Sequence, residues 1–324
     1  MERKIEFIIP DEFRGKTVEQ FLKSKGFTKQ SLVELKKHEN NLLIDNKWVF
    51  VTHKLSGKET LVCNIFEDAT SEKITPVCLG FDIVYEDEDI LVVDKPYNMP
   101  IHPSLNNYEN TLANAVAYYN LNKGLNYPFR CINRLDKDTS GLVLIAKHYL
   151  SAGILNKMMS KREIKRKYLA IADGDLTKPN EDLTKIIENI KSYNNKNFFY
   201  KRDNNLNSGK ISLPIGRVDN STIERFIDYE NGEMAITNYN IIEVKNNKTL
   251  LSLNLETGKT HQIRVHLKAL GYPLIGDFLY NPNDNSMNRQ ALHSHKLRFN
   301  HPISGKTLEF LSPMPDDMYK AFNS

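Results

Sequence analysis

The sequence predicts an α+β fold: a mixed, mostly antiparallel sheet with flanking helices, preceded by a small N-terminal module of two helices and a hairpin. Beyond about residue 78, strand patterns outnumber helical ones and several alternate apolar and polar residues. Between residues 17 and 51, two capped amphipathic segments precede a hairpin pattern. The chain has no glycine-rich phosphate loop, dinucleotide-binding fingerprint or internal repeat, which disfavours a nucleotide-binding α/β fold.

Composition indicates a globular chain of two domains. Its 324 residues are 40% hydrophobic, and the formal net charge is only +4. There is no apolar run long enough for a membrane span, and the N-terminal residues lack the pattern of a signal peptide. The three scattered cysteines are typical of a reducing cytoplasm rather than of a disulfide framework.

Basic residues concentrate near the N-terminus. From Arg14 to Lys37 there are seven Lys or Arg and two Glu, a local charge of +5. Thr17 and Thr28 are expected N-caps of helices over TVEQFLKSKG and KQSLVELKKH. A hairpin is expected with strands at 42–44 and 48–51 and a turn at Asp45-Asn46.

This order of helices and hairpin resembles the S-four-type RNA-binding module, named after a bacterial ribosomal protein. The resemblance implies that Lys29, Lys36 and Lys37 present their charges to RNA phosphates. Asn46 stands where that module has glycine, and asparagine also tolerates left-handed geometry. The alternative is a small, solvated helical cap. The expected division is a module at 1–67, a linker at 68–77 and a second domain at 78–324.

The densest group of polar residues lies in the segment CINRLDKDTSGLVLIAK, residues 131–147. Arg134, Asp136 and Asp138 stand in a loop that runs directly into an apolar strand. Carboxylates held in such a loop need cations or donors, and a strand gives a reactive group a rigid support. The alternative is a structural ion pair of Arg134 with either aspartate.

A second polar segment, ETGKTHQIRVHLKALGYPLIGD, covers residues 256–277. Thr260 is an expected N-cap of a helix that Gly271 ends. Ile263, Leu267 and Leu270 share one helical face, which predicts that this face packs on the core. Arg264 lies at its border, where an arginine usually meets a carboxylate. His261 and His266 stand about 140° apart around the helix, which disfavours a shared metal.

A third segment, residues 157–174, carries six Lys or Arg against one Glu between Lys157 and Tyr168, and then a short apolar strand, YLAIA. A basic run is usually a solvated face, and a tyrosine at the start of a strand is often a core residue. Both alternatives stay open from the residues themselves.

These three segments closely resemble the RluA family of RNA pseudouridine synthases. The resemblance implies that Asp136 is the catalytic aspartate, that Arg264 pairs with it, and that Tyr168 lies against the target base. It also assigns Arg134 to the gap left when the target nucleotide leaves its stack. Asn133 stands where the family commonly has histidine, in a supporting role.

The likeness covers residues 14 to about 318, apart from an Asn- and Lys-rich stretch at 175–209. We interpret that stretch as an insertion on the surface, containing one helix and a loop; an RNA-touching flap is the alternative. Residues 85–104 resemble a first core segment of the family, and residues 289–315 its closing hairpin. Both are expected to be structural, including His293 and His295.

The expected function is therefore isomerisation of uridine to pseudouridine in structured RNA, with ribosomal RNA favoured and transfer RNA possible. No cofactor and no metal are expected, because the reaction gains and loses no atoms. A monomer in the cytoplasm is expected. Two rivals remain: a non-catalytic RNA-binding or ribosome-assembly protein on the same fold, and a glycoside hydrolase. The hydrolase lacks an identifiable second carboxylate to pair with Asp136.

Overall fold

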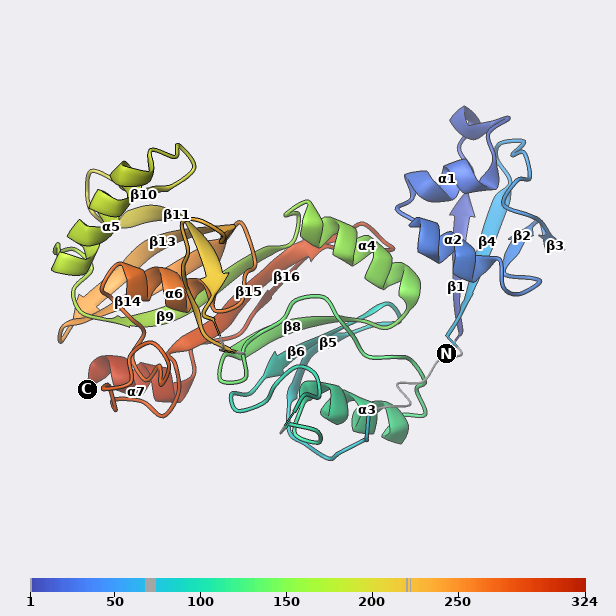
Figure 1. Ribbon diagram of the computed structural model, residues 1–324. Helices are drawn as coiled ribbons and strands as arrows, with labels where there is room; N and C mark the ends of the chain where they lie inside the picture. The colour runs from blue at the N-terminus through green and yellow to red at the C-terminus, as the bar shows by residue number, and fades with distance from the viewer. Residues whose placement is uncertain (1, 68–73, 106, 220, 222) are drawn as a thin grey trace.

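The computed structural model describes residues 2–67, 74–105, 107–219, 221 and 223–324, which form two separate sheets (Figure 1). The predicted linker at 68–77 lies mostly outside these residues. In the described part of the chain, no helix is long and apolar enough to cross a membrane.

Residues 2–67, here called the N-terminal module, pack two short helices against a four-stranded sheet of order β1-β4-β2-β3. Thr17 and Thr28 accept hydrogen bonds from Gln20 N and Ser31 N, so both predicted N-caps are confirmed. The elements are β1 (Glu2–Ile8), a 3-10 turn (Asp11–Phe13), α1 (Val18–Ser24), α2 (Lys29–Leu35), β2 (Leu42–Ile44), β3 (Lys47–Trp48) and β4 (Thr60–Phe66).

Three details of the module differ from the sequence prediction. The strand β1 was not foreseen, and it pairs along its whole length with β4. Its apolar pattern is weak because only Ile5 of its seven residues is buried. The second helix ends at Leu35 rather than at His38, and the second hairpin strand has only two residues.

The second sheet is mixed and mostly antiparallel, which confirms the predicted fold class. Its main order is β10-β11-β13-β14-β9-β15-β8-β6-β5, with β12, β16 and β7 attached at the sides. The strands are β5 (Asp82–Glu86), β6 (Ile90–Lys95), β7 (Arg130–Cys131), β8 (Ser140–Ala146), β9 (Lys165–Asp173), β10 (Phe199–Arg202), β11 (Ser208–Arg217), β12 (Arg225–Ile227), β13 (Glu233–Lys245), β14 (Lys248–Leu255), β15 (Leu292–Asn300) and β16 (Thr307–Leu311). The helices are α3 (Leu112–Asn122), α4 (Tyr149–Ser160), α5 (Glu181–Tyr193), α6 (Gln262–Ala269) and α7 (Asp316–Asn323).

One parallel contact in this sheet joins β8 to β15, where Ser140 pairs with His293 and Gly141 with Ser294. Gly141 has φ +110°, and a Cβ atom there would lie 2.4 Å from the Ser294 carbonyl oxygen. Glycine is therefore required, because any side chain would push the two strands apart. This close approach holds the polar loop before β8 at the centre of the sheet.

The stretch at 175–209, interpreted as an insertion on the surface, packs against the main core at one edge of the sheet. The expected helix is present as α5, with Leu183 and Ile186 buried in the main core. The expected loop contains β10, which pairs with β11 at the edge of the sheet. Phe198 is buried and the Tyr200 hydroxyl hydrogen-bonds that of Tyr239, because alternate residues of this edge strand face the core.

Helix α4 connects the module to the second sheet (Figure 1). Leu150 is buried in the module's own hydrophobic cluster. Gly153 lets α2 approach closely, since a Cβ atom there would lie 3.1 Å from the Thr28 side chain. The C-terminal end of α4 leads toward β9, the strand that carries Tyr168.

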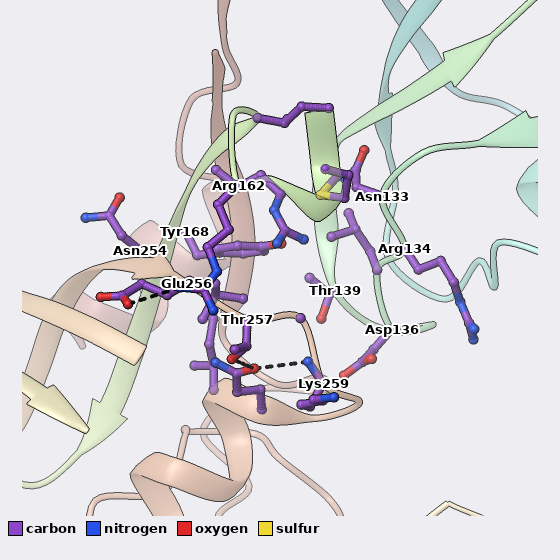
Figure 2. A pocket seen from close by; sticks show the side chains of 18 of the residues that line it. Asn133, Arg134, Asp136, Thr139, Arg162, Tyr168, Asn254, Glu256, Thr257 and Lys259 are labelled. Atoms are coloured by element: carbon purple, nitrogen blue, oxygen red, sulfur yellow. Dashed lines mark hydrogen bonds and ion pairs between the residues drawn. The ribbon is translucent and has the colours of Figure 1, made fainter. Parts of the chain in front are cut away.

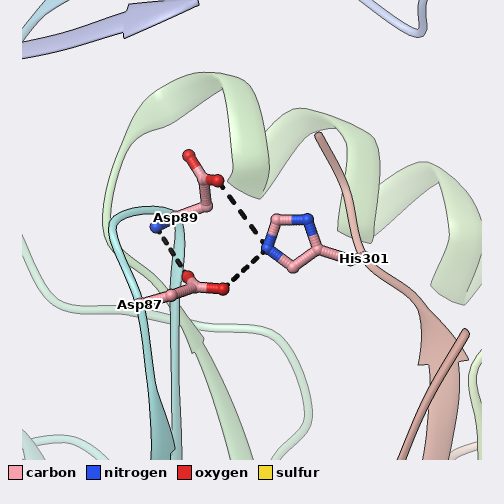
Figure 3. A group of neighbouring side chains, drawn as sticks. All are labelled: Asp87, Asp89 and His301. Carbon is pink, nitrogen blue, oxygen red and sulfur yellow. Dashed lines mark hydrogen bonds and ion pairs between the residues drawn. The ribbon is translucent and has the colours of Figure 1, made fainter. Parts of the chain in front are cut away.

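A cluster of charged side chains adds a polar contact between module and sheet. Arg3 of β1 donates from Nε to Asp89 Oδ1 at 2.9 Å, and the buried His148 lies 2.9 Å from the same oxygen. His301 Nε2 lies 3.0 Å from Asp87 Oδ2, as Figure 3 shows. Among the described residues, Asp87, Asp89 and His301 are the one group with the spacing of metal ligands, but Arg3 already neutralises Asp89.

This cluster predicts a loss of stability in acid. Burial acts to raise the pKa of Asp89, but His148 and Arg3 outweigh it and hold the pKa below its usual 3.8. A carboxylate with a lowered pKa in the folded state stabilises the protein above about pH 4, and that contribution disappears as pH falls through the lowered pKa. Wild type should therefore have a larger free energy of unfolding than Asp89→Asn, and this difference should shrink below pH 4. Urea unfolding at several pH values measures it. A difference independent of pH would contradict this.

Candidate active site

The loop that carries Asp136 is held from three sides. Asn133 bonds the backbone of β8, donating to Leu142 O at 3.1 Å and accepting from Leu144 N at 2.8 Å. The buried Lys95 donates to Lys137 O at 3.1 Å, and Arg289 Nη1 lies 3.4 Å from Asp138 O. Asn133 thus has the supporting role that the sequence predicted, and the loop is a rigid platform.

Asp136 faces Arg264, which lies on helix α6. Arg264 Nη1 lies 3.2 Å from Asp136 Oδ2, and the aspartate side chain keeps 27% of its surface exposed. Ile263, Leu267 and Leu270 are buried, which confirms the predicted core face of this helix. The Asp136 carboxylate is therefore partly open to solvent and is held in place by the Arg264 guanidinium.

The main partner of Arg264 is a residue that the sequence analysis missed. Asp277 accepts two hydrogen bonds from the guanidinium, one from Nε at 2.7 Å and one from Nη2 at 2.8 Å. Both side chains are buried, with 3% and 0% of their surface exposed. This two-pronged geometry fixes the guanidinium plane, so its remaining Nη1 points at Asp136.

Helix α6 begins differently from the prediction. The N-cap is His261 in left-handed geometry, with φ 56° and no side-chain capping bond, so the Thr260 cap was wrong. The His261 ring has another partner: its Nδ1 lies 2.9 Å from the Tyr280 hydroxyl, and its Nε2 lies 3.8 Å from Asp136 Oδ2. Burial lowers the pKa of His261 despite the nearby aspartate, which favours a neutral ring beside the carboxylate.

The side chain of His266 lies in a different environment from that of His261. It is fully buried and contacts the Thr237 hydroxyl at 2.9 Å, and burial lowers its pKa to about 4. The two histidines therefore do not share a metal site in the described residues.

Tyr168 lines a cleft of about 1000 Å³ that also contains Asp136 and Arg264 (Figure 2). Tyr168 is 4% exposed and belongs to the main core cluster, so it is both a core residue and part of the cleft wall. Tyr168 lies on β9, where it pairs with Leu253 of β14 on one side and Ser294 of β15 on the other. A fixed aromatic face of this kind can stack on a planar base.

Arg134 and Arg162 stand at the rim of the cleft. Arg134 points away from Asp136 in Figure 2 and makes no ion pair with any described residue, so the alternative of a structural Arg134 ion pair finds no support. Arg162 lies 3.7 Å from Glu256. The lining holds six Lys or Arg and two carboxylates, Asp136 and Glu256, a net charge of +4 that suits an anionic ligand.

Lys95 was missed as part of this site. The sequence indicated only the end of a strand, but its ammonium is buried and donates to the carbonyls of Pro96, Met99 and Lys137. Burial lowers its pKa to about 7, against the opposing effect of Asp138 and Asp136. No local pattern marks such a lysine, because its three acceptors come from two loops that meet only in the folded chain.

The predicted RNA-binding lysines lie on the surface of α2 and directly after its C-terminal end. Lys29 and Lys36 are exposed and have no ion-pair partner among the described residues. Lys37 differs, because its Nζ lies 2.6 Å from Glu34. Lys157 of α4 is exposed, as are Lys161 and Arg162 in the turn that follows, and Arg162 lines the cleft.

Comparison with known proteins identifies the family to which the chain belongs. Residues 89–269 match the family model described as RNA pseudouridylate synthase. This match covers more than half of the chain and includes Asp136, Tyr168 and Arg264. The chain belongs to the family of RNA pseudouridine synthases of the RluA type, and it is an isomerase.

Two relatives are similar over most of their length. An uncharacterised RNA pseudouridine synthase of Bacillus subtilis (strain 168), YjbO, is 32% identical over 94% of this chain and 97% of its own. The ribosomal large subunit pseudouridine synthase D of Vibrio parahaemolyticus is 34% identical over 82% and 77%. The structure of human RNA pseudouridylate synthase domain containing 1 has the same fold, with a TM-score of 0.54, 24% identity and coverage of 76% and 86%.

Proposed function

We propose that this enzyme converts specific uridines of structured RNA to pseudouridine, with Asp136 as the catalytic carboxylate. Ribosomal RNA is the favoured substrate. The observation that carries the proposal is the position of Asp136. It is held by Arg264 at 3.2 Å, stands on a rigid loop, and lines the same positively charged cleft as Tyr168. The aspartate is partly exposed, so a substrate can reach it.

The reaction breaks the bond between ribose and uracil nitrogen, rotates the base and joins the sugar to ring carbon 5. A proton leaves that carbon and the freed nitrogen gains one, so atoms balance without a cofactor. Positive charge grows on the sugar as the first bond breaks, and the Asp136 carboxylate opposes it. Arg264 keeps this carboxylate oriented, and Tyr168 stacks on the base.

The target nucleotide must leave its stack before it enters the cleft, which costs a few kcal/mol. Arg134 is the candidate to fill the gap, because it is exposed, unpaired among the described residues and adjacent to the catalytic loop. Ribosomal RNA is favoured because several relatives are named as synthases of the large ribosomal subunit. The monomeric state and the cytoplasmic location remain predictions.

The test is a pseudouridine map of ribosomal and transfer RNA from a deletion strain, complemented with wild type or with Asp136→Asn. Sites that disappear on deletion and return only with wild type support the reaction, the aspartate and the substrate together. Sites that return with both proteins would contradict the role of Asp136. A non-catalytic assembly protein predicts that Asp136→Asn restores ribosome assembly fully while the map stays unchanged.

The N-terminal module is proposed to bind RNA through phosphates. Changing Lys29, Lys36 and Lys37 together to glutamine should weaken RNA binding roughly tenfold at physiological salt and reduce the salt slope by about two. Filter binding of total ribosomal RNA at several salt concentrations measures both quantities.

The matched control carries three Lys→Gln changes at Lys185, Lys191 and Lys320, which lie on α5 and α7 at the end of the molecule away from the module (Figure 1). It has the same net charge as the test variant. If both variants lose affinity equally, then overall charge rather than the module directs binding.

A further inference from the structure

Arg166 stands beside the catalytic residues without an assigned role. It lies on β9 two residues before Tyr168, so both side chains are on the same face of the strand, and both line the cleft. Its neighbours Lys165 and Lys167 are exposed, whereas Arg166 is partly buried. Lys165 also lines the cleft, but of these three cations Arg166 alone is partly buried.

The guanidinium of Arg166 has no partner among the described residues. Its Nε is buried and makes no hydrogen bond. Both carboxylates of the cleft are already engaged: Asp136 with Arg264, and Glu256 with Lys210 at 2.7 Å. A buried, unpaired arginine nitrogen is costly, so an anionic acceptor supplied by a ligand would remove an unfavourable feature.

The guanidinium lies over a fixed turn. A Cβ atom on Gly258 would be at ordinary contact distance, 3.5 and 3.7 Å, from its two terminal nitrogens, so the guanidinium lies close against this turn. Gln262 holds this turn by accepting from the Thr257 hydroxyl at 2.8 Å and from Lys259 N at 3.0 Å. The arginine is therefore confined between a rigid turn and the strand.

We propose that Arg166 binds the phosphate next to the target nucleotide and so places the uridine over Tyr168 and Asp136. The inference rests on the proposed function for the identity of the nucleotide. A planar guanidinium binds two phosphate oxygens at once, which fixes both distance and angle. A phosphate does not react, so its binding energy serves to orient the reacting sugar. Arg166 is thus a positioning residue.

The first test needs no knowledge of the RNA target. Full-length protein labelled with ¹⁵N-arginine is titrated with uridine, uridine 5′-monophosphate and uridine 3′-monophosphate, and the Arg166 Nε–H signal is assigned by its loss in Arg166→Gln. At least one monophosphate should shift this signal and bind about tenfold more tightly than uridine. Arg166→Gln should abolish that difference, and Arg166→Lys should restore part of it.

The matched control is Lys167→Gln, which removes the same charge one residue away on the opposite face of β9. It should keep the full preference for the monophosphate. If the Arg166 signal ignores both monophosphates, or if Arg166→Gln keeps the preference, the proposal is wrong. A thermal melt verifies that each variant is folded.

The second test uses pseudouridine formation on ribosomal RNA from the deletion strain. Arg166→Gln should raise KM about tenfold and change kcat by less than threefold, whereas a purely structural role would lower kcat and the melting temperature together. An inactive wild-type protein that still binds the monophosphate through Arg166 would refute the proposed function alone, so the two failures are distinguishable.

Discussion

Changing Asp136 to asparagine is expected to lower pseudouridine formation by at least ~10⁴-fold, because the carboxylate that opposes charge on the sugar is removed while the shape of the cleft is kept. RNA binding should stay within a few fold, since phosphate contacts supply most of the affinity. Stability should change by about 1 kcal/mol or less, because the side chain is 27% exposed and Arg264 retains Asp277.

The matched control is Asp138→Asn, the same change two residues away in the same loop. Sequence spacing does not distinguish the two aspartates, but in the structure the guanidinium of Arg264 bonds Asp136. Asp138→Asn should therefore reduce turnover by less than about tenfold. Single-turnover assays on ribosomal RNA from the deletion strain measure both variants. Equal losses would mean that the charge of the loop, rather than Asp136 itself, is required.

The largest effect on stability is expected from Asp277→Asn, which should lower the free energy of unfolding by about 3–5 kcal/mol. Asp277 has no exposed surface and accepts both prongs of the Arg264 guanidinium, so the variant leaves a buried cation without its counter-charge. Turnover should fall as well, because the guanidinium is then free to rotate away from Asp136. Urea unfolding gives the first quantity and the single-turnover assay the second.

Asp284→Asn is the control for this prediction. Asp284 lies in the same segment and accepts from Gly276 N, but it is partly exposed and has no buried cation as its partner. Its replacement should cost about 1 kcal/mol or less. Loss of activity in Asp277→Asn without loss of stability would show that Asp277 acts on orientation only.

Much of the fold was predictable because its signals are local. Thr17 and Thr28 cap helices through residues three positions away, and the apolar face of α6 repeats at helical spacing. Where local signals were weak, prediction failed. β1 and β10 are edge strands, and β1 has only one buried residue. The start of α6 depends on His261 in left-handed geometry rather than on a capping side chain.

The site was predictable in part. Its polar loop and its basic strand stand out as dense groups of charged residues, and resemblance to a family selected Asp136, Tyr168 and Arg264 from them. Asp277 ends the second polar segment, but thirteen positions separate it from Arg264 and no helical spacing predicts that they pair. Lys95 and Arg289 were missed because they hold the loop through backbone carbonyls, which carry no sequence signal.

By itself, the sequence determined the class of fold, the caps of the two helices in the N-terminal module, the buried face of α6 and the chemical types present in the three polar segments. These depend on interactions between residues a few positions apart. The tertiary structure decided which charges meet: that Arg264 is oriented by Asp277, that β8 can lie against β15 because Gly141 has no side chain, and that Arg166 is left without a carboxylate. Such pairings depend on strand order and on close packing between distant segments, and the local periodicity of a chain does not record either of them.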